Sequence, residues 1–211
     1  MPPQSRDASE VAAVRNRILD MAEELLSRHG FEGLSMRRIA ARMEMTATNL
    51  YYYFLNKDEI YLAIQTRGFA RLAERFEELE REHPDPLERL YHFTVAYCTF
   101  GFENAGQYAI MFTMNTPKYA DYVGTKLEEQ ALFEKNTALR VAEITARAIA
   151  QTAERNPGLK LADPMWETVK AWIMVHGLVS LSASRVLQEV VPDISAAAEK
   201  LARDLLASWT A

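Results

Sequence analysis

A small, polar run, Thr-Ala-Thr-Asn, occupies residues 46–49, just ahead of the aromatic stretch Tyr51–Tyr53. If a helix begins at Thr46, its hydroxyl accepts one of the backbone N–H groups left unpaired at a helix start, and the next three residues point outward. Side chains placed in this way can hydrogen-bond to base edges in the major groove of DNA. The residue types in this segment therefore suit the recognition of DNA bases by hydrogen bonding.

Two short helices joined by a tight turn would position these groups. Ile39, Ala40 and Met43 recur at helical spacing before the turn, and Leu50 and Phe54 lie four residues apart after it. Each helix therefore has an apolar edge that can pack against a third helix.

The third helix is predicted just upstream. Its apolar residues follow the i, i+4, i+7, i+8 pattern, and they are Ile18, Ala22, Leu25 and Leu26. The helix is expected to stop at His29-Gly30, with glycine in its usual position after a helix end. Downstream, Asn56 and Glu59 have the spacing of a capping pair, which places Lys57 in the first turn of a fourth helix. A helix start with free N–H groups and a lysine can hold a phosphate.

At this point the chain resembles the tetracycline-repressor (TetR) family of bacterial regulators. The resemblance rests on residues at family spacing over about sixty positions; they are Ile18, Ala22, Leu26, Gly30, Phe31, Ile39, Ala40, Leu50, Tyr51, Phe54, Lys57 and Ile60. It implies a homodimer on a palindromic operator. Tyr51, Tyr53 and Lys57 are then expected at phosphates, and Ala47, Thr48, Asn49 and Tyr52 at bases. With these, the predicted DNA-binding set also includes Ser35, Arg37, Arg38 and Thr46.

Two positions depart from the family pattern. Glu44 occupies a turn position that is often glycine, and Thr48 replaces a residue that is often glycine, alanine or proline. An acidic side chain at the turn is unfavourable near DNA unless Arg38 or Arg42 compensates.

Composition agrees with a globular DNA-binding protein. The 211 residues allow one or two domains. The net charge of −5 conceals a local positive charge between residues 35 and 57, where four basic residues face Glu44 alone. A single cysteine excludes an internal disulfide, the first ten residues lack the apolar run of a signal peptide, and no stretch could cross a membrane. A cytoplasmic location without a membrane partner is expected.

The rest of the chain is predicted to be helical, which gives an all-α fold of about nine helices. A helix-turn-helix domain over residues 1–55 precedes a larger effector-binding and dimerisation bundle over residues 56–211. Capping residues, prolines and glycines delimit the expected helices of this bundle, which cover about 56–81, 85–101, 108–114, 119–155, 163–190 and 192–209.

The last two long helices are the predicted dimer surface. Small and branched apolar residues at helical spacing suit close helix packing, and they are Val175, Leu178, Val179, Ala183, Val186, Ile194, Ala197, Ala198, Leu201, Leu205 and Ala207. The alternative is that these faces only close the protomer's own core. Dimerisation is favoured because a two-fold dimer reads two half-sites.

Aromatic residues and methionines in the bundle suit an apolar effector pocket, and they suit an ordinary helical core equally well. The candidate pocket residues are Tyr97, Phe100, Met111, Phe112, Phe133, Trp172 and His176. The last two belong to a Trp-x-x-x-His-Gly motif that is similar to one seen in a TetR subgroup. His176 is either a buried structural histidine or an effector contact.

The sequence contains no motif that predicts a catalytic site. The four histidines lie far apart in sequence, and there is no zinc-binding spacing or phosphate-binding glycine loop. No enzyme activity, cofactor or metal is expected. Cys98 is predicted to be a small core residue, with a redox sensor as the alternative.

The function predicted from the sequence is a homodimeric repressor released from its operator by a small apolar or aromatic ligand. Two alternatives are kept. One is a DNA-binding regulator without a small effector, and the other is a helical ligand-binding or adaptor protein that has lost DNA binding.

Overall fold

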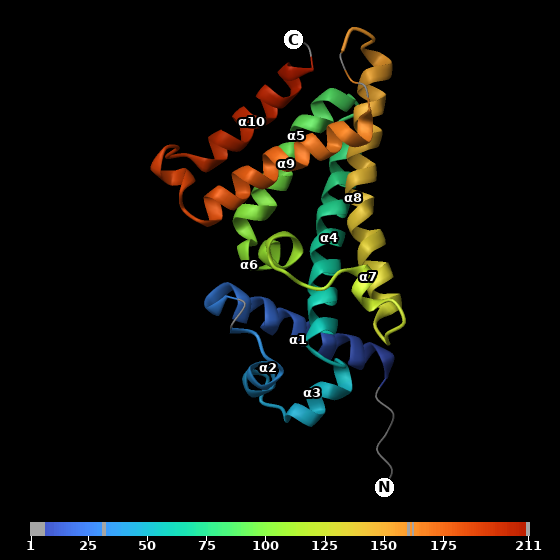
Figure 1. Ribbon diagram of the computed structural model, residues 1–211, viewed down its shortest axis with the longest axis vertical. Helices are drawn as coiled ribbons and strands as arrows, with labels where there is room; N and C mark the ends of the chain where they lie inside the picture. The colour runs from blue at the N-terminus through green and yellow to red at the C-terminus, as the bar shows by residue number, and fades with distance from the viewer. Residues whose placement is uncertain (1–6, 31–32, 160, 162, 210–211) are drawn as a thin grey trace. The chain divides into compact units, whose positions relative to one another are not determined.

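A computed structural model describes residues 7–30, 33–159, 161 and 163–209 (Figure 1). These residues form helices and connecting turns and no strand, so the all-α prediction is confirmed. The elements are α1 Ala8–His29, α2 Met36–Arg42, α3 Ala47–Tyr53, α4 Lys57–Glu82, α5 Pro86–Glu103, α6 Ala105–Tyr108, the π-helix η2 Ala109–Thr113, α7 Tyr119–Tyr122, α8 Glu128–Arg155, α9 Pro164–Ala183, the 3₁₀-helix η3 Leu187–Glu189 and α10 Ile194–Ser208.

Two compact units divide the chain. The first comprises Met1–Gly68 and Gly106–Lys135, and the second comprises Phe69–Ala105 and Asn136–Ala211. These units are defined by packing, whereas the predicted boundary after residue 55 concerns function, and that boundary stays a prediction.

The core of the first unit joins the helix-turn-helix to later segments. Of the nine apolar residues predicted to face inward in this region, Met43 is half-buried and the other eight are buried. The eight are Ile18, Ala22, Leu25, Leu26, Ile39, Ala40, Leu50 and Phe54. Ile60 and Ile64 of α4 and Ile110 of η2 belong to the same apolar cluster and are fully buried. The short helices α2 and α3 therefore share their core with residues far along the chain.

Side-chain caps fix most helix starts where the sequence placed them. The Thr46 hydroxyl accepts the Asn49 N–H at 3.1 Å, and the Asn56 side-chain oxygen accepts the Glu59 N–H at 3.0 Å. Asp85, Asp163 and Asp193 cap α5, α9 and α10 in the same way. Each cap satisfies a donor that would otherwise be unpaired, so these five predicted helix starts are confirmed. The segment expected over residues 108–114 instead begins at Ala105 and continues as a π-helix from Ala109.

Two predicted helices are shorter than expected. The helix expected over residues 119–155 is broken between α7 and α8, where Gly124 has φ 78° and its N–H binds the Glu128 carboxylate at 2.8 Å. The helix expected to reach residue 190 ends at Ala183, and Arg185 follows with φ 62°. Both breaks use the left-handed conformation, which ends a helix without proline.

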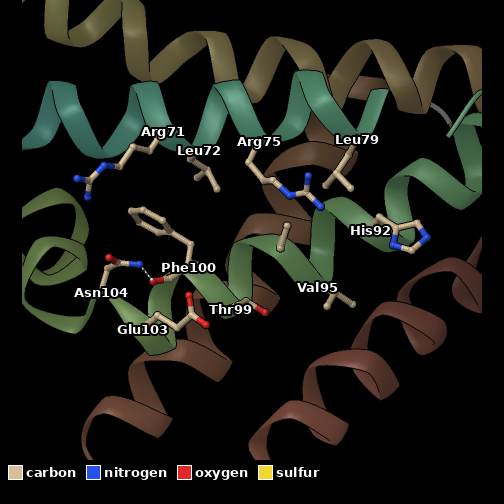
Figure 2. A pocket seen from close by; sticks show the side chains of 11 residues that line it. Arg71, Leu72, Arg75, Leu79, His92, Val95, Thr99, Phe100, Glu103 and Asn104 are labelled. Carbon is tan, nitrogen blue, oxygen red and sulfur yellow. Dashed lines mark hydrogen bonds between the residues drawn. The ribbon is translucent and has the colours of Figure 1, made fainter. Parts of the chain in front are cut away.

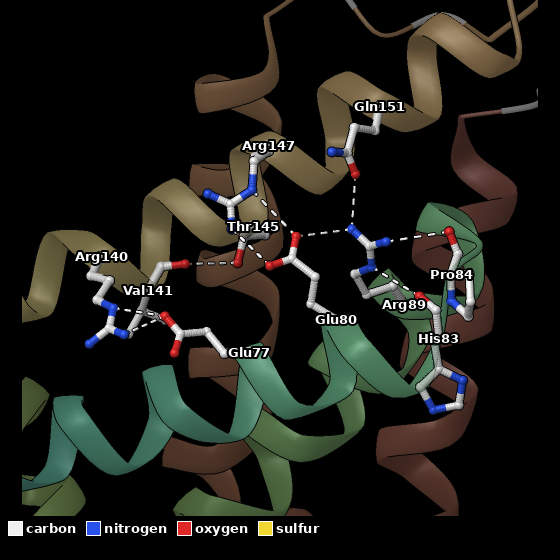
Figure 3. A network of polar contacts seen from close by, with 10 residues as sticks. All are labelled: Glu77, Glu80, His83, Pro84, Arg89, Arg140, Val141, Thr145, Arg147 and Gln151. Carbon is white, nitrogen blue, oxygen red and sulfur yellow. Dashed lines mark hydrogen bonds and ion pairs between the residues drawn. The ribbon is translucent and has the colours of Figure 1, made fainter.

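In the second unit, α5, α9 and α10 pack on one another. The indole N–H of Trp209 donates to the Glu167 carboxylate at 3.1 Å, and the Phe76 and Phe93 rings stack with centroids 4.3 Å apart. Ion pairs link α4 to α8 through Glu77 with Arg140 and Glu80 with Arg147 (Figure 3).

Part of the predicted dimer surface belongs to this internal packing. Four of its residues are at most 5% exposed because they face neighbouring helices of the same protomer, and these are Val175, Val179, Ala198 and Leu205. No helix in the described part of the chain has the length and apolarity that a bilayer span requires.

Candidate nucleic-acid interface

The start of α3 presents polar and aromatic groups on a rigid base. Thr48 is exposed and Ala47 and Asn49 are half-buried, while Tyr51 and Tyr52 are 53% and 67% exposed. The opposite edge of the helix holds the buried Leu50 and Phe54 described above. With the core on one side and solvent on the other, α3 can enter a groove without losing its packing.

The turn before α3 explains the unusual Glu44. The Met45 N–H donates to the Ala40 carbonyl at 3.0 Å, and the Glu44 N–H donates to the Ala41 carbonyl at 3.2 Å. This is the Schellman pattern, whose residue after the helix cap takes the left-handed conformation. Glu44 has φ 53°, so a residue with a β-carbon stands where glycine is favoured.

Basic residues surround this turn. Arg37, Arg38 and Arg42 of α2 are exposed, and one Arg38 guanidinium N–H donates to the Gly33 carbonyl at 3.3 Å. Ser35 caps α2 by accepting the Arg38 N–H at 3.2 Å. The Ser35 hydroxyl is therefore already engaged in the fold, and its predicted contact with DNA stays a prediction.

Lys57 lies in the first turn of α4, as the sequence indicated. Its ammonium group is 5.2 Å from the centroid of the Tyr61 ring, and the side chain is half-buried. The adjacent Glu59 carboxylate is buried and bound on both oxygens, by Arg15 at 2.8 Å and by the Leu55 N–H at 2.6 Å. Because Glu59 is paired inside the protein, its charge is partly neutralised beside the candidate phosphate site.

Arg15 helps to hold the end of α3 and the start of α4 in place, and the sequence did not predict this role. It lies on α1, donates to the Tyr53 carbonyl and the Glu59 carboxylate, and stands 4.0 Å over the centroid of the Phe54 ring. It therefore joins α1 to the end of α3 and the start of α4. Its position in the middle of α1 carried no local signal, because its partners lie 38 and 44 residues away.

Tyr53 differs from its two aromatic neighbours. It is 3% exposed, belongs to the core of the first unit, and meets the Tyr52 ring edge-on with centroids 5.2 Å apart. The ring therefore supports α3 from within. A contact between Tyr53 and a phosphate stays a prediction.

Comparison with known proteins agrees with this geometry. Residues 18–64 match the family model described as bacterial regulatory proteins of the tetR family, and residues 90–205 match the tetracyclin repressor-like C-terminal domain. The chain belongs to the TetR family. TetR proteins are DNA-binding transcriptional regulators and not enzymes.

Individual relatives extend the comparison. A regulator from the dhlA 5′ region of Xanthobacter autotrophicus is 42% identical over 59 residues, covering 28% of this chain and 29% of that protein. The regulator UidR of Escherichia coli K12 is 25% identical over 160 residues, covering 73% and 75% of the two chains. A TetR/AcrR regulator from Thermobifida fusca superposes with a TM-score of 0.68 at 21% identity, over 92% of this chain and 97% of that one, which shows a shared fold.

The TetR chain also contains a groove in its second unit (Figure 2). It has a volume of about 360 Å³ and is lined by Arg71, Leu72, Arg75, Leu79, His92, Val95, Ala96, Thr99, Phe100, Glu103 and Asn104. The first four come from α4, and the others come from α5 and its cap. Apolar side chains form part of the lining, and two guanidinium groups and one carboxylate add charge to it.

The seven predicted pocket residues do not line this groove together. Of them only Phe100 does so. Met111 is buried in the first unit, Phe112 is half-buried there, and Phe133 is 64% exposed on α8. Helical periodicity identified apolar positions but could not separate core residues from surface residues, so a pocket built from all seven stays a prediction.

The other three predicted residues lie in the second unit. The Trp172 indole N–H donates to the Tyr97 hydroxyl at 2.9 Å, which ties α9 to α5. The His176 ring nitrogen is 3.4 Å from the Ser180 hydroxyl, and burial lowers the His176 pKa. This hydrogen bond is what a structural histidine would make.

Two of the histidines that are separated in sequence are neighbours in space. The rings of His83 and His92 stack with centroids 3.7 Å apart. The corner formed by residues 84–86, Pro-Asp-Pro, reverses the chain between α4 and α5 and brings them together. Sequence separation alone was therefore a poor guide here.

Proposed function

We propose that this TetR regulator is a homodimeric repressor that binds a palindromic operator and leaves it when a small ligand binds. The observation that carries the proposal is the start of α3, exposed on one side and fixed by the Thr46 cap and the shared core on the other. Repression follows from a simple competition, because a dimer bound across a promoter excludes the polymerase.

The dimer is supported by an apolar face on α9. Trp166, Ile173 and Leu181 are 57%, 62% and 48% exposed. Their separations of seven and eight residues place them on one side of the helix. This row replaces the buried residues Val175 and Val179 as the centre of the proposed interface.

The proposed effector site is the groove between α4 and α5. Leu72, Leu79 and Phe100 offer an apolar surface, while Arg71 and Arg75 would favour a ligand that also carries an acidic group. Helix α4 runs without a break from this groove to Lys57 in its first turn. A shift of α4 would therefore change the spacing of two DNA-reading heads, whose half-sites lie about 34 Å apart on the duplex.

The first experiment is selection of bound duplexes from a random DNA pool at about physiological salt. An enriched palindrome supports the dimeric regulator and supplies the probe for ligand tests. Absence of enrichment, together with no salt-dependent binding to any duplex, favours the adaptor alternative.

Two substitutions divide the roles within the interface. Lys57→Ala is expected to weaken binding to all sequences alike and to reduce the salt slope by about one, because a phosphate contact is lost. Asn49→Ala is expected to change base preference at one position of each half-site. Fluorescence anisotropy on operator and random duplexes at several salt concentrations measures both effects. Equal losses on both duplexes for both variants would contradict this division.

Ligand release is tested with the selected operator. Alkyl and aromatic carboxylates and their neutral amides are titrated into the complex, and the acids are expected to release DNA at lower concentration. Phe100→Ala should abolish the response while leaving operator affinity unchanged. If saturating ligand leaves the operator affinity unchanged, the regulator without an effector is the better description.

A further inference from the structure

Three potential metal ligands converge at the corner between α4 and α5. His83 follows the last residue of α4, and Glu88 and His92 lie one turn apart on α5. The Nδ1 atom of His83 is 3.3 Å from Oε1 of Glu88, and the Nε2 atom of His92 is 3.9 Å from the same oxygen. One donor atom from each residue lies within 4.8 Å of the other two.

These separations match the size of a coordination sphere. Zinc–nitrogen bonds of about 2.0–2.1 Å in a tetrahedron place neighbouring donor atoms about 3.3 Å apart. The two distances to the carboxylate lie at or slightly above this value. The imidazole rings are nearly parallel, with 14° between their planes, so one ring must turn about its Cβ–Cγ bond to aim its lone pair at a shared ion.

The backbone at His83 is held in place by hydrogen bonds from Arg89. The Arg89 Nε atom donates to the His83 carbonyl at 3.1 Å, and a terminal nitrogen donates to the Pro84 carbonyl at 3.4 Å (Figure 3). Arg89 is 6% exposed and is itself fixed by Glu80 at 3.1 Å and Gln151 at 2.9 Å. A supported corner reduces the ordering that metal binding would otherwise require.

The side chains are sheltered but still open to solvent. His83, His92 and Glu88 are 21%, 33% and 56% exposed, so an ion can enter and water can complete its coordination.

We propose that His83, Glu88 and His92 form a binding site for a divalent transition-metal ion, with Zn²⁺ the best match and water in the fourth position. Two imidazoles and one carboxylate are a donor set typical of zinc. A bound ion would fasten the end of α4 to α5. The proposal does not rest on DNA binding or on an effector, but the metal site and the groove share His92.

The test is titration of Zn²⁺ into the full-length protein after chelator treatment, in competition with a chromophoric chelator. One ion per chain is expected. His92→Ala and Glu88→Gln are each expected to weaken binding at least about tenfold, because loss of a direct ligand costs no less than loss of an outer partner. His29→Ala, which removes an exposed histidine on α1, is the matched control and should bind like wild type.

A second measurement guards against misfolded variants. Zn²⁺ should raise the Tm of the wild type and of His29→Ala but leave that of Glu88→Gln unchanged, and Glu88 is exposed enough for its amide to be tolerated. Cobalt substituted at the site should give the strong visible absorption of a tetrahedral ion. Failure of the wild type to bind one ion, or equal binding by wild type and His92→Ala, would overturn the proposal.

Discussion

Glu44 is one of two non-glycine residues in the described part of the chain whose backbone is left-handed, the other being Arg185. The left-handed conformation costs a residue with a β-carbon about 1 kcal/mol, and glycine avoids that cost while losing more entropy on folding. Glu44→Gly is therefore expected to stabilise the protein by up to about 1 kcal/mol, whereas Glu44→Gln should not. Chemical denaturation at fixed protein concentration measures the difference.

The same pair of variants separates strain from charge. Both remove a negative charge from the turn before α3, so both should raise the affinity for random DNA by about twofold at low salt. A gain in affinity with glycine but none with glutamine would show that turn geometry, and not charge, limits binding.

Cys98 is expected to be chemically silent in the native protein. Its side chain is fully buried, and burial raises the pKa of the thiol to about 12. At pH 8 only about one thiol in ten thousand is then ionised, and the thiolate is the reactive form. A disulfide reagent should label one thiol promptly in guanidinium and very slowly in buffer. Rapid labelling of the folded protein would instead revive the redox-sensor reading.

At the scale of elements, the junction of α4, α5 and α8 depends on one buried guanidinium. Arg89→Met would leave Glu80 without its sheltered partner, although the half-exposed Arg147 remains beside it. We expect a loss of about 2–4 kcal/mol, near the lower end for a broken buried pair, because Glu80 keeps this second partner. Urea unfolding at constant protein concentration gives the value.

Arg140→Met is the matched control, because Arg140 on α8 also pairs with a glutamate of α4, Glu77, but its side chain is about half exposed. Exposed pairs contribute less than about 1 kcal/mol. Equal losses for the two variants would mean that burial does not distinguish these ion pairs.

The elements also show what the sequence could and could not predict. A cap and the N–H group that it accepts lie within a few residues of each other. The helix starts at Thr46, Asn56 and Asp85 could therefore be predicted from local sequence. The helix break at Gly124 was not predicted because glycine is tolerated within a helix, and only the φ of 78° in the structure shows the turn. Contacts of Arg15 and of the His83–His92 pair were missed because a chain reversal or a distant partner creates them.

At the scale of the whole molecule, the proposed reading of two operator half-sites depends on the proposed dimer. Ile173→Glu places a charge in the proposed α9 interface and is expected to convert a dimer into a monomer in sedimentation velocity. The operator affinity should fall at the same time, because two linked half-sites become independent.

Leu132→Glu supplies the control, since Leu132 is a 40% exposed apolar residue on α8, outside the proposed interface. It should remain dimeric. A dimer that survives Ile173→Glu would move the interface away from α9.

The shared core of the first unit has a consequence for how such regulators can be recombined. Ile110 packs fully buried among residues of α1, α2 and α3, and Gly106 lies so near α1 that a β-carbon there would stand 3.1 Å from the Ser27 nitrogen. A chimera joined after residue 55 would inherit the predicted DNA-binding residues. Part of the core beneath them would then come from the other protein. Exchange of operator specificity between relatives should therefore succeed more often when residues 106–116 travel with the head, as a discontinuous module.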